Sequence, residues 1–166
     1  MITSFAPIEP ADAKILLLGT MPSVQSLLQA RYYGNPQNVF WKLIFALWDK
    51  PEPKEYQEKT AFLKEKRIAL WDVLMACERE GSLDSNIKNP QPNDIIGLLE
   101  RQPHIHTIFF NSQNAERFFR RLVLRDIERE YRYVTLPSSS PARVMRFDEK
   151  LSHWRAVRLA LERGTV

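Results

Sequence analysis

The chain has 166 residues, 44% of them hydrophobic and 27% charged, and its net charge is only +4. This is enough apolar material for one domain with a sizeable core, so we expect a single domain over 1–166 and exclude wholesale disorder. No apolar run is long enough to span a membrane, no signal-peptide pattern is present and the one cysteine, Cys77, cannot pair internally, which predicts a cytoplasmic protein without a membrane partner.

Short, nearly continuous apolar runs alternate with amphipathic segments along the chain. They predict, in order, a strand at 14–19, helices at 39–48 and 55–66, a strand at 67–73, a helix at 93–101, a strand at 107–111, a helix at 115–124, a strand at 132–136 and a helix at 148–162. Such an alternation indicates a parallel sheet covered by helices on both faces. Ligands of these sheets bind beyond the carboxyl ends of the strands.

Polar segments follow each predicted strand at that edge. They cover residues 19–23 and 31–38, 77–89, 111–114, and 137–143, and are rich in Asn, Ser, Gly, Pro and Tyr. One such loop is routine turn chemistry. Four at one edge of a sheet predict a site with amide and hydroxyl groups, aromatic rings for stacking and a phosphate clamp.

Several common sites have no signature in the sequence. The chain has no phosphate-binding P-loop, no dinucleotide fingerprint and no nucleophile elbow. His104 and His106 stand just before the third strand without a second cluster of ligands, which favours strand-edge histidines over a metal site.

Basic residues are concentrated in the C-terminal part of the chain. Residues 101–166 contain 13 Lys or Arg, all but one of them Arg, against 7 Asp or Glu, whereas residues 1–100 contain 11 against 13. Arg is suited to planar contacts with phosphate, so this half indicates a polyanionic partner. The alternative is an ordinary solvated helix surface.

Four segments in this order resemble the uracil-DNA glycosylase superfamily, and most closely its hypoxanthine-DNA glycosylase branch. They are GTMPS at 19–23, YYGNPQNVFW at 32–41, WDVLMACEREGSLDSNI at 71–87 and LPSSSPAR at 136–143. The resemblance runs from about residue 15 to about residue 154. It implies a three-layer α/β/α fold with a central four-stranded parallel sheet. It also implies an enzyme of base-excision repair that flips a deaminated base, hypoxanthine or uracil, out of DNA and hydrolyses its N-glycosidic bond.

Two positions depart from the pattern of that branch. Ser23 stands where Gly is usual, and its side chain narrows the room for close backbone approach. Asn35 stands where His is usual, and it keeps hydrogen-bonding capacity but has no titratable group. The preferred base and the preference for single or double strands stay open.

The resemblance places a functional asparagine at Asn38. Glycosidic hydrolysis passes through a transition state resembling an oxocarbenium ion, and an Asn amide can orient the attacking water and support the cationic sugar. The alternative is that Asn38 only caps the helix that begins at residue 39.

Five further residues are expected to form the pocket for the base. Asn111 follows the third strand, where the resemblance implies a base-reading amide, and turn initiation is the alternative. Tyr32 and Tyr33 are candidates to stack on the flipped base, although burial of at least one in the core is the simpler role. Met21 and Ser23 are expected to line the pocket through backbone groups.

The loop at 137–143 resembles the family's strand-clamping loop. Ser138, Ser139 and Ser140 would hold the phosphates that flank the lesion. Arg143 would fill the gap left by the flipped base, and a plain phosphate contact is the alternative. Asp84, which matches the family's SLDSxI segment with Ser82, Ser85 and Asn86, is better explained as a turn cap.

Water is the implied nucleophile, so we expect no metal and no organic cofactor. Lys88 is the only lysine in the site loops, which predicts a monofunctional enzyme without a Schiff-base step. The expected partner is DNA containing deaminated bases, bound by a monomer. Two alternatives remain: a non-catalytic nucleic-acid-binding module on the same fold, and a hydrolase of free nucleosides or small phosphorylated molecules, which would not need the LPSSSPAR loop.

Overall fold

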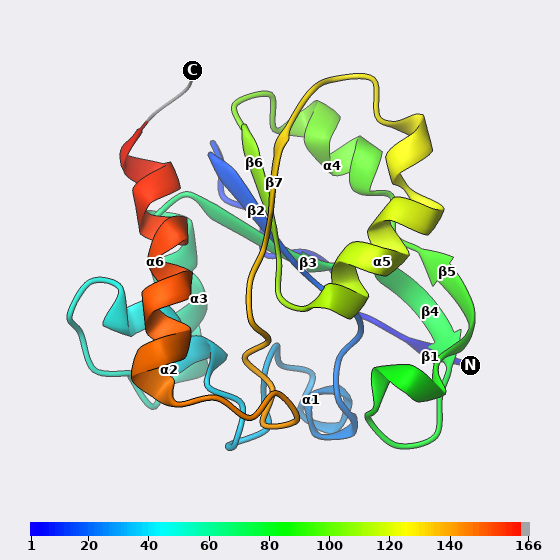
Figure 1. The fold of residues 1–166 in the computed structure, drawn as a ribbon, viewed down its shortest axis with the longest axis horizontal. Helices are drawn as coiled ribbons and strands as arrows, with labels where there is room; N and C mark the ends of the chain where they lie inside the picture. Colours follow the sequence, from blue (N-terminus) through cyan, green and yellow to red (C-terminus); the bar gives the residue numbers. More distant parts are fainter. Residues whose placement is uncertain (164–166) are drawn as a thin grey trace.

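Strands and helices alternate along the chain in the computed structural model, which describes residues 1–163 (Figure 1). The strands are β1 Ile2–Thr3, β2 Ile15–Gly19, β3 Ile68–Asp72, β4 Leu74–Glu78, β5 Lys88–Pro92, β6 Thr107–Phe110 and β7 Arg132–Thr135. The helices are α1 Val24–Gln29, α2 Phe40–Ala46, α3 Tyr56–Glu65, α4 Ile95–Arg101, α5 Gln113–Leu122 and α6 Phe147–Glu162, with 3-10 turns η1 Asp84–Asn86 and η2 Leu124–Asp126.

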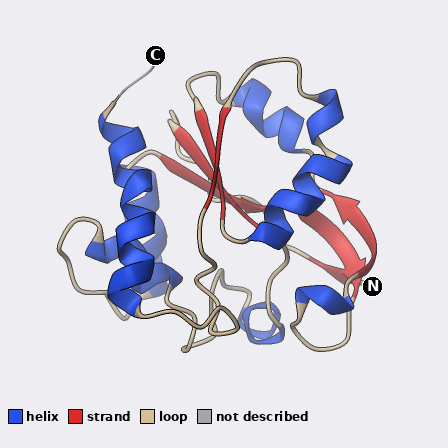
Figure 2. Cartoon of the chain, in the orientation of Figure 1, coloured by secondary structure: helices blue, strands red, loops and turns tan. Residues whose placement is uncertain are grey.

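The central sheet has four parallel strands in the order β3-β2-β6-β7. Helices α2, α3 and α6 cover one of its faces, and α4 and α5 cover the other (Figure 2). The predicted three-layer α/β/α fold is therefore confirmed, and each of the four predicted strands matches an observed one to within two residues at either end.

Strand β2 lies in the middle of the core, and its side chains pack against the helices on both faces of the sheet. Ile15 and Leu17 pack into a cluster with the α2, α3 and α6 side, whereas Leu16 and Leu18 pack into a second cluster on the α4 and α5 side. All four are fully buried. A strand buried on both faces needs no polar alternation, which is why the sequence shows a continuous apolar run here.

A second, smaller sheet was not predicted. It is antiparallel, with the order β1-β4-β5, and β4 follows β3 after Val73 alone. Because β4 and β5 occupy both ends of the segment 77–89, only its middle part is the loop that the sequence had indicated over the whole length. Strand β5, with the sequence KNPQP, is mostly exposed at the edge of this sheet, which is where prolines are tolerated in strands.

Two local features concern the start of α4 and the segment before β6. Asp94 caps α4, since its Oδ1 accepts a hydrogen bond from the Gly97 N–H at 3.0 Å. His104 and His106 lie just before β6, at the opposite edge of the sheet from its carboxyl end. Among the residues that the structure describes, no helix is both long and apolar enough to cross a membrane.

Candidate active site

The order of the central strands places a crevice between β2 and β6. The chain leaves β2 toward β3 on one side and leaves β6 toward β7 on the other, so the connections diverge at this point. In open parallel sheets ligands bind at such a divergence, outside the carboxyl ends of the strands. A cavity of about 760 Å³ occupies this place, and all ten predicted site residues are among those that line it.

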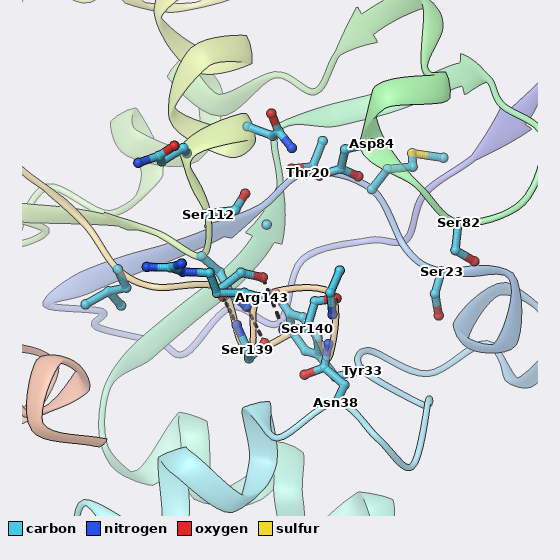
Figure 3. Close-up of a pocket in the computed structure, with 18 of the residues that line it drawn as sticks. Thr20, Ser23, Tyr33, Asn38, Ser82, Asp84, Ser112, Ser139, Ser140 and Arg143 are labelled. Carbon is cyan, nitrogen blue, oxygen red and sulfur yellow. Dashed lines mark hydrogen bonds between the residues drawn. The ribbon is translucent and has the colours of Figure 1, made fainter. Parts of the chain in front are cut away.

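Residues from distant segments meet in this cavity, which we call the pocket. Figure 3 shows Tyr33 and Asn38 beside Ser139 and Ser140 in one part of the pocket. Thr20 and Asp84 lie together in another part (Figure 3).

The serine loop, residues 136–143, is fastened to the sheet by Asn111. The Asn111 Nδ2 donates to Ser139 Oγ at 2.8 Å and to Tyr33 Oη at 3.1 Å, and its Oδ1 accepts from the Ser139 N–H at 2.9 Å. The Val39 N–H donates to the Ser139 carbonyl at 3.1 Å and joins the same loop to α2. Both Asn111 hydrogens are thus used inside the protein, so reading a base would rely on the second lone pair of Oδ1 or on an exchange of partners.

The two adjacent tyrosines have different surroundings. Tyr32 is 5% exposed and donates from its hydroxyl to the Ala6 carbonyl at 2.7 Å, so its ring belongs to the core, as the simpler reading of the sequence has it. Tyr33 has φ 54°, a left-handed backbone conformation that changes the direction of the chain after Tyr32. The Tyr33 ring stacks on Phe40 at 4.0 Å between centroids, and Tyr33 lines the pocket. Because Tyr32 belongs to the core, Tyr33 is the remaining candidate to stack on the base.

Asn38 is both a cap and a pocket residue. Its Oδ1 accepts from the Phe40 N–H at 2.9 Å at the start of α2, so the capping alternative is correct as a structural role. The side chain is half-buried and lines the pocket. No hydrogen bond of its Nδ2 occurs within 1–163, so this amide can cap the helix with one atom and serve the pocket with the other.

Hydroxyl-to-backbone bonds fix the shape of the serine loop. Ser138 Oγ accepts from the Ser140 N–H, and Ser140 Oγ accepts from the Ala142 N–H, both at 3.1 Å. Ser139 is only 1% exposed and faces inward, so Ser138 and Ser140 are the hydroxyls that DNA can reach without rearrangement.

A lysine missed by the sequence analysis supports this loop from behind. Lys150 of α6 is buried and its Nζ donates to the Ser140 carbonyl at 3.2 Å. Burial, with the nearby positive charge of Arg143, lowers the pKa of Lys150. Lys150 belongs to α6 and not to a loop that follows a strand, so no motif in the sequence indicates its contact with the serine loop.

Arg143 stands at the rim of the pocket and is exposed. Val144 beside it is 89% exposed. Among the described residues Arg143 takes part in no ion pair, whereas Arg146 pairs with Asp148 at 3.0 Å. Its guanidinium is therefore available to a nucleic acid at the mouth of the pocket.

Two acidic residues in the pocket escaped the sequence analysis or were assigned another role. Asp72, the last residue of β3, is 3% exposed, and burial raises its pKa to about 7, with the charge of Asp84 adding to the rise. Asp84 begins the turn η1 but forms no side-chain cap there, so the expected capping role is wrong. Burial also raises the pKa of Asp84.

Unpaired polar atoms accompany these acids. Within 1–163, four buried side-chain atoms have no hydrogen-bond partner, and two of them, Asp72 Oδ2 and Thr20 Oγ1, belong to residues that line the pocket. Leaving a buried donor or acceptor unsatisfied costs about 1–3 kcal/mol. Such unsatisfied groups are few in native proteins, so this part of the pocket is a candidate for ligand binding.

Arg79, whose positive charge lowers the pKa of both acids, is held by other groups. Arg79 donates from Nε to the Gly81 carbonyl at 2.8 Å and from Nη2 to the Pro22 carbonyl at 2.6 Å. It forms no ion pair with either carboxyl group among the described residues. No group of three or more His, Cys, Asp or Glu in this part of the chain is arranged to hold a metal ion.

Fold and pocket together define an α/β protein in which a polar cavity at the carboxyl edge of the sheet opens beside a serine and arginine loop. Residues 6–162 match the model of the uracil DNA glycosylase superfamily, and the chain belongs to this family. The predicted family and enzyme class, a DNA glycosylase, are thereby confirmed.

Three relatives describe the similarity. The chain is 38% identical over 154 residues to a hypoxanthine DNA glycosylase of Methanosarcina acetivorans, covering 92% of this chain and 95% of the relative. It is 33% identical over 112 residues to a hypoxanthine DNA glycosylase of Methanosarcina barkeri, covering 67% and 71%. A solution NMR structure of a uracil-DNA-glycosylase-like protein from M. acetivorans superposes with a TM-score of 0.82 at 37% identity, covering 96% of this chain and 98% of that one.

Proposed function

We propose that this DNA glycosylase removes hypoxanthine from DNA by water attack at C1′, with Asn38 as the residue that orients the water. The observation that carries the proposal is the convergence of amide, hydroxyl and aromatic groups from four strand ends on one cavity. Two relatives are named hypoxanthine DNA glycosylases, and this chain aligns with most of the length of each. Their names favour hypoxanthine over uracil as the main substrate.

Binding begins with extrusion of the damaged nucleotide. A mispaired base costs less to flip, which itself selects for deaminated bases. Ser138, Ser140 and Arg143 would hold the backbone beside the lesion while the base enters the pocket. All of these groups come from one chain, so we propose that the monomer is the functional unit.

The chemistry requires only water. As the bond between C1′ and the base nitrogen breaks, the electron pair leaves with the base and the sugar acquires oxocarbenium character. The water oxygen then bonds to C1′, one water proton is lost to solvent, and the base takes up one proton, so the products are an abasic sugar and the free base. Asn38 lies at the start of α2 with its Nδ2 and one Oδ1 lone pair left to position this water.

A panel of oligonucleotides tests this proposal. Each carries a single deoxyinosine, deoxyuridine or deoxyxanthosine, in duplex and in single-stranded form, and is incubated with the purified protein in chelator. We expect alkali-labile sites, formed fastest with deoxyinosine. Faster cleavage of deoxyuridine would overturn the substrate assignment, and binding without cleavage of any base would leave a nucleic-acid-binding module.

A further inference from the structure

Asp72 is a buried acidic residue that lines the pocket. It is the last residue of β3, the strand beside β2, and Asn93 fixes its backbone by donating from Nδ2 to the Asp72 carbonyl at 2.9 Å. A side chain on Gly19 would bring its Cβ to 2.5 Å from Asp72 Oδ1 and 2.8 Å from Tyr33 Oη. The absence of a side chain at Gly19 therefore leaves room for this carboxyl group beside the tyrosine.

The surroundings of Asp72 disfavour a negative charge. The titratable and charged groups that face it are Asp84 from η1, Arg79 from the segment after β4, and the hydroxyls of Tyr32 and Tyr33. Asp84 repels a second negative charge, and Arg79 is held by two carbonyls rather than by the carboxyl group. No hydrogen-bond donor reaches Asp72 Oδ2 among the described residues.

A carboxyl group without an ion pair or a donor is more stable as the neutral acid. The neutral acid carries a proton, and a buried O–H needs an acceptor. Asp72 Oδ2 has none within the described protein, and its residue lines the cavity. Either oxygen of the carboxyl group can carry the proton, and the acceptor that it lacks can enter the cavity with the ligand.

We propose that Asp72 is a base-recognition residue, held as a neutral carboxylic acid that donates a hydrogen bond from its carboxyl group to an acceptor atom of the flipped base. The inference rests on the proposed function, because the ligand it recognises is the base to be excised. Hypoxanthine offers its carbonyl oxygen and the ring nitrogens N3 and N7 as acceptors, whereas N1 carries a hydrogen and N9 bears the sugar. These acceptor atoms become more negative as the glycosidic bond breaks. The hydrogen bond from Asp72 therefore strengthens toward the transition state and accelerates departure of the base.

The first test is the pH dependence of single-turnover excision from a deoxyinosine duplex. The wild-type rate is expected to fall as the pH rises through about 7, where Asp72 loses its proton. Asp72→Asn keeps a donor that does not titrate, so its rate should be several-fold lower than the wild-type rate at acid pH but constant toward alkaline pH. Asp72→Ala removes the donor and should lose about a hundredfold, the scale seen for one donor to a developing negative charge.

Asp84→Asn is the matched control, since it changes the other pocket carboxyl group. It removes a negative charge that disfavours ionisation of Asp72. The excision rate of this variant should therefore fall at a lower pH than the rate of the wild type does. A role of Asp72 in packing alone would leave every profile in place and would change only the thermal midpoint of the variants. A wild-type profile shared by Asp72→Asn would overturn the proposal.

Binding of an uncleavable probe separates this inference from the proposed function. The probe is a duplex with one 2′-fluorinated deoxyinosine, whose glycosidic bond resists hydrolysis, and fluorescence anisotropy measures its affinity. Asp72→Ala should weaken the probe about tenfold and leave an undamaged duplex unaffected. If wild-type protein excises no base but binds the probe through Asp72, only the proposed function fails. If it excises hypoxanthine and Asp72→Ala changes neither excision nor binding, only the role of Asp72 fails.

Discussion

The two edges of the central sheet treat acidic side chains in opposite ways. At the amino edge, Glu9 accepts from Arg101 Nη2 and from Gln102 Nε2, both at 2.9 Å. The hydrogen bond from Arg101 holds the pKa of Glu9 below its usual value. Asp12, at the same edge, pairs with Arg67 and lies 2.6 Å from His104 Nδ1. The hydrogen bond with His104 is the main cause that lowers the pKa of Asp12.

At the carboxyl edge Asp72 is buried and Asp84 is half-buried, and neither forms an ion pair among the described residues. Burial raises the pKa of both. Paired acids at one edge join distant segments and serve stability. Unpaired acids at the other edge reduce stability, and they lie in the cavity where the ligand is expected. Shifted titration in a cleft is a feature of functional sites, so the contrast between the two edges supports the proposed site at the carboxyl edge.

The largest expected effect is on stability as a function of pH. The folded-state pKa of Asp72 is raised to about 7 from 3.8, so its contribution is fully present below the unfolded pKa and is lost as the pH rises through the folded pKa. Asp72→Asn removes this loss and should gain on the order of 4 kcal/mol in unfolding free energy, relative to wild type, between about pH 4 and above pH 7. Urea unfolding at several pH values measures the difference.

Asp12→Asn is the opposite case and serves as the control. Its folded pKa is lowered, so its stability is present at neutral pH and is lost as the pH falls through that lowered pKa. The variant should be less stable than wild type at neutral pH and equal to it at strongly acid pH. If both variants change stability with the same sign at neutral pH, the contrast between the edges is wrong.

Asn38→Ala should reduce single-turnover excision by at least about a hundredfold while changing DNA affinity little, since the group acts on the water. The variant also loses its cap on α2, a cost of about 1 kcal/mol. Asp94→Ala loses a comparable cap on α4, outside the pocket, and should be destabilised similarly with normal excision. Equal excision by both variants would reduce Asn38 to a helix cap.

Arg143→Ala should weaken lesion DNA about tenfold, and more than undamaged DNA, if the guanidinium fills the gap left by the flipped base. If it only neutralises a phosphate, both duplexes should weaken equally and the salt slope should fall by roughly one. Arg146→Ala, which removes an exposed arginine already paired with Asp148, should change neither. Anisotropy titrations at several salt concentrations distinguish these results, and unchanged affinity in Arg143→Ala would remove the loop from the interface.

Periodicity and burial explain which parts of the fold were predictable. Strands β2, β3 and β6 are fully buried, apolar runs because both of their faces are covered, and such runs stand out in the sequence. Strand β7, at the edge of the sheet, is only partly buried. Helix α1 does not stand out, since Val24 and Leu28 are exposed and no apolar stripe forms. The β1-β4-β5 sheet depends on pairing between residues far apart, such as Ile2 with Cys77, and carries no local signal.

The site was predictable where one segment carries the pattern and hidden where it depends on contacts. Asn38 and the serine loop follow from local motifs, and the structure brings them together. The hydrogen bond between Asn111 and Ser139 joins residues 28 positions apart, so no local motif shows that the Asn111 amide is hydrogen-bonded inside the protein. Asp72 ends an apolar strand and has the appearance of a strand boundary. Its significance lies in burial and a missing partner, which only the folded chain reveals.

We propose that base excision takes place at the carboxyl edge of the central sheet. The most direct test of this proposal is mass-spectrometric detection of the released base and the abasic strand from a single-deoxyinosine duplex, with wild-type protein and Asn38→Ala side by side. Wild-type protein is expected to release free hypoxanthine and to leave an equimolar abasic strand, and release by the variant should be at least about a hundredfold slower. Equal release by both proteins, or none by the wild type, would contradict the proposal.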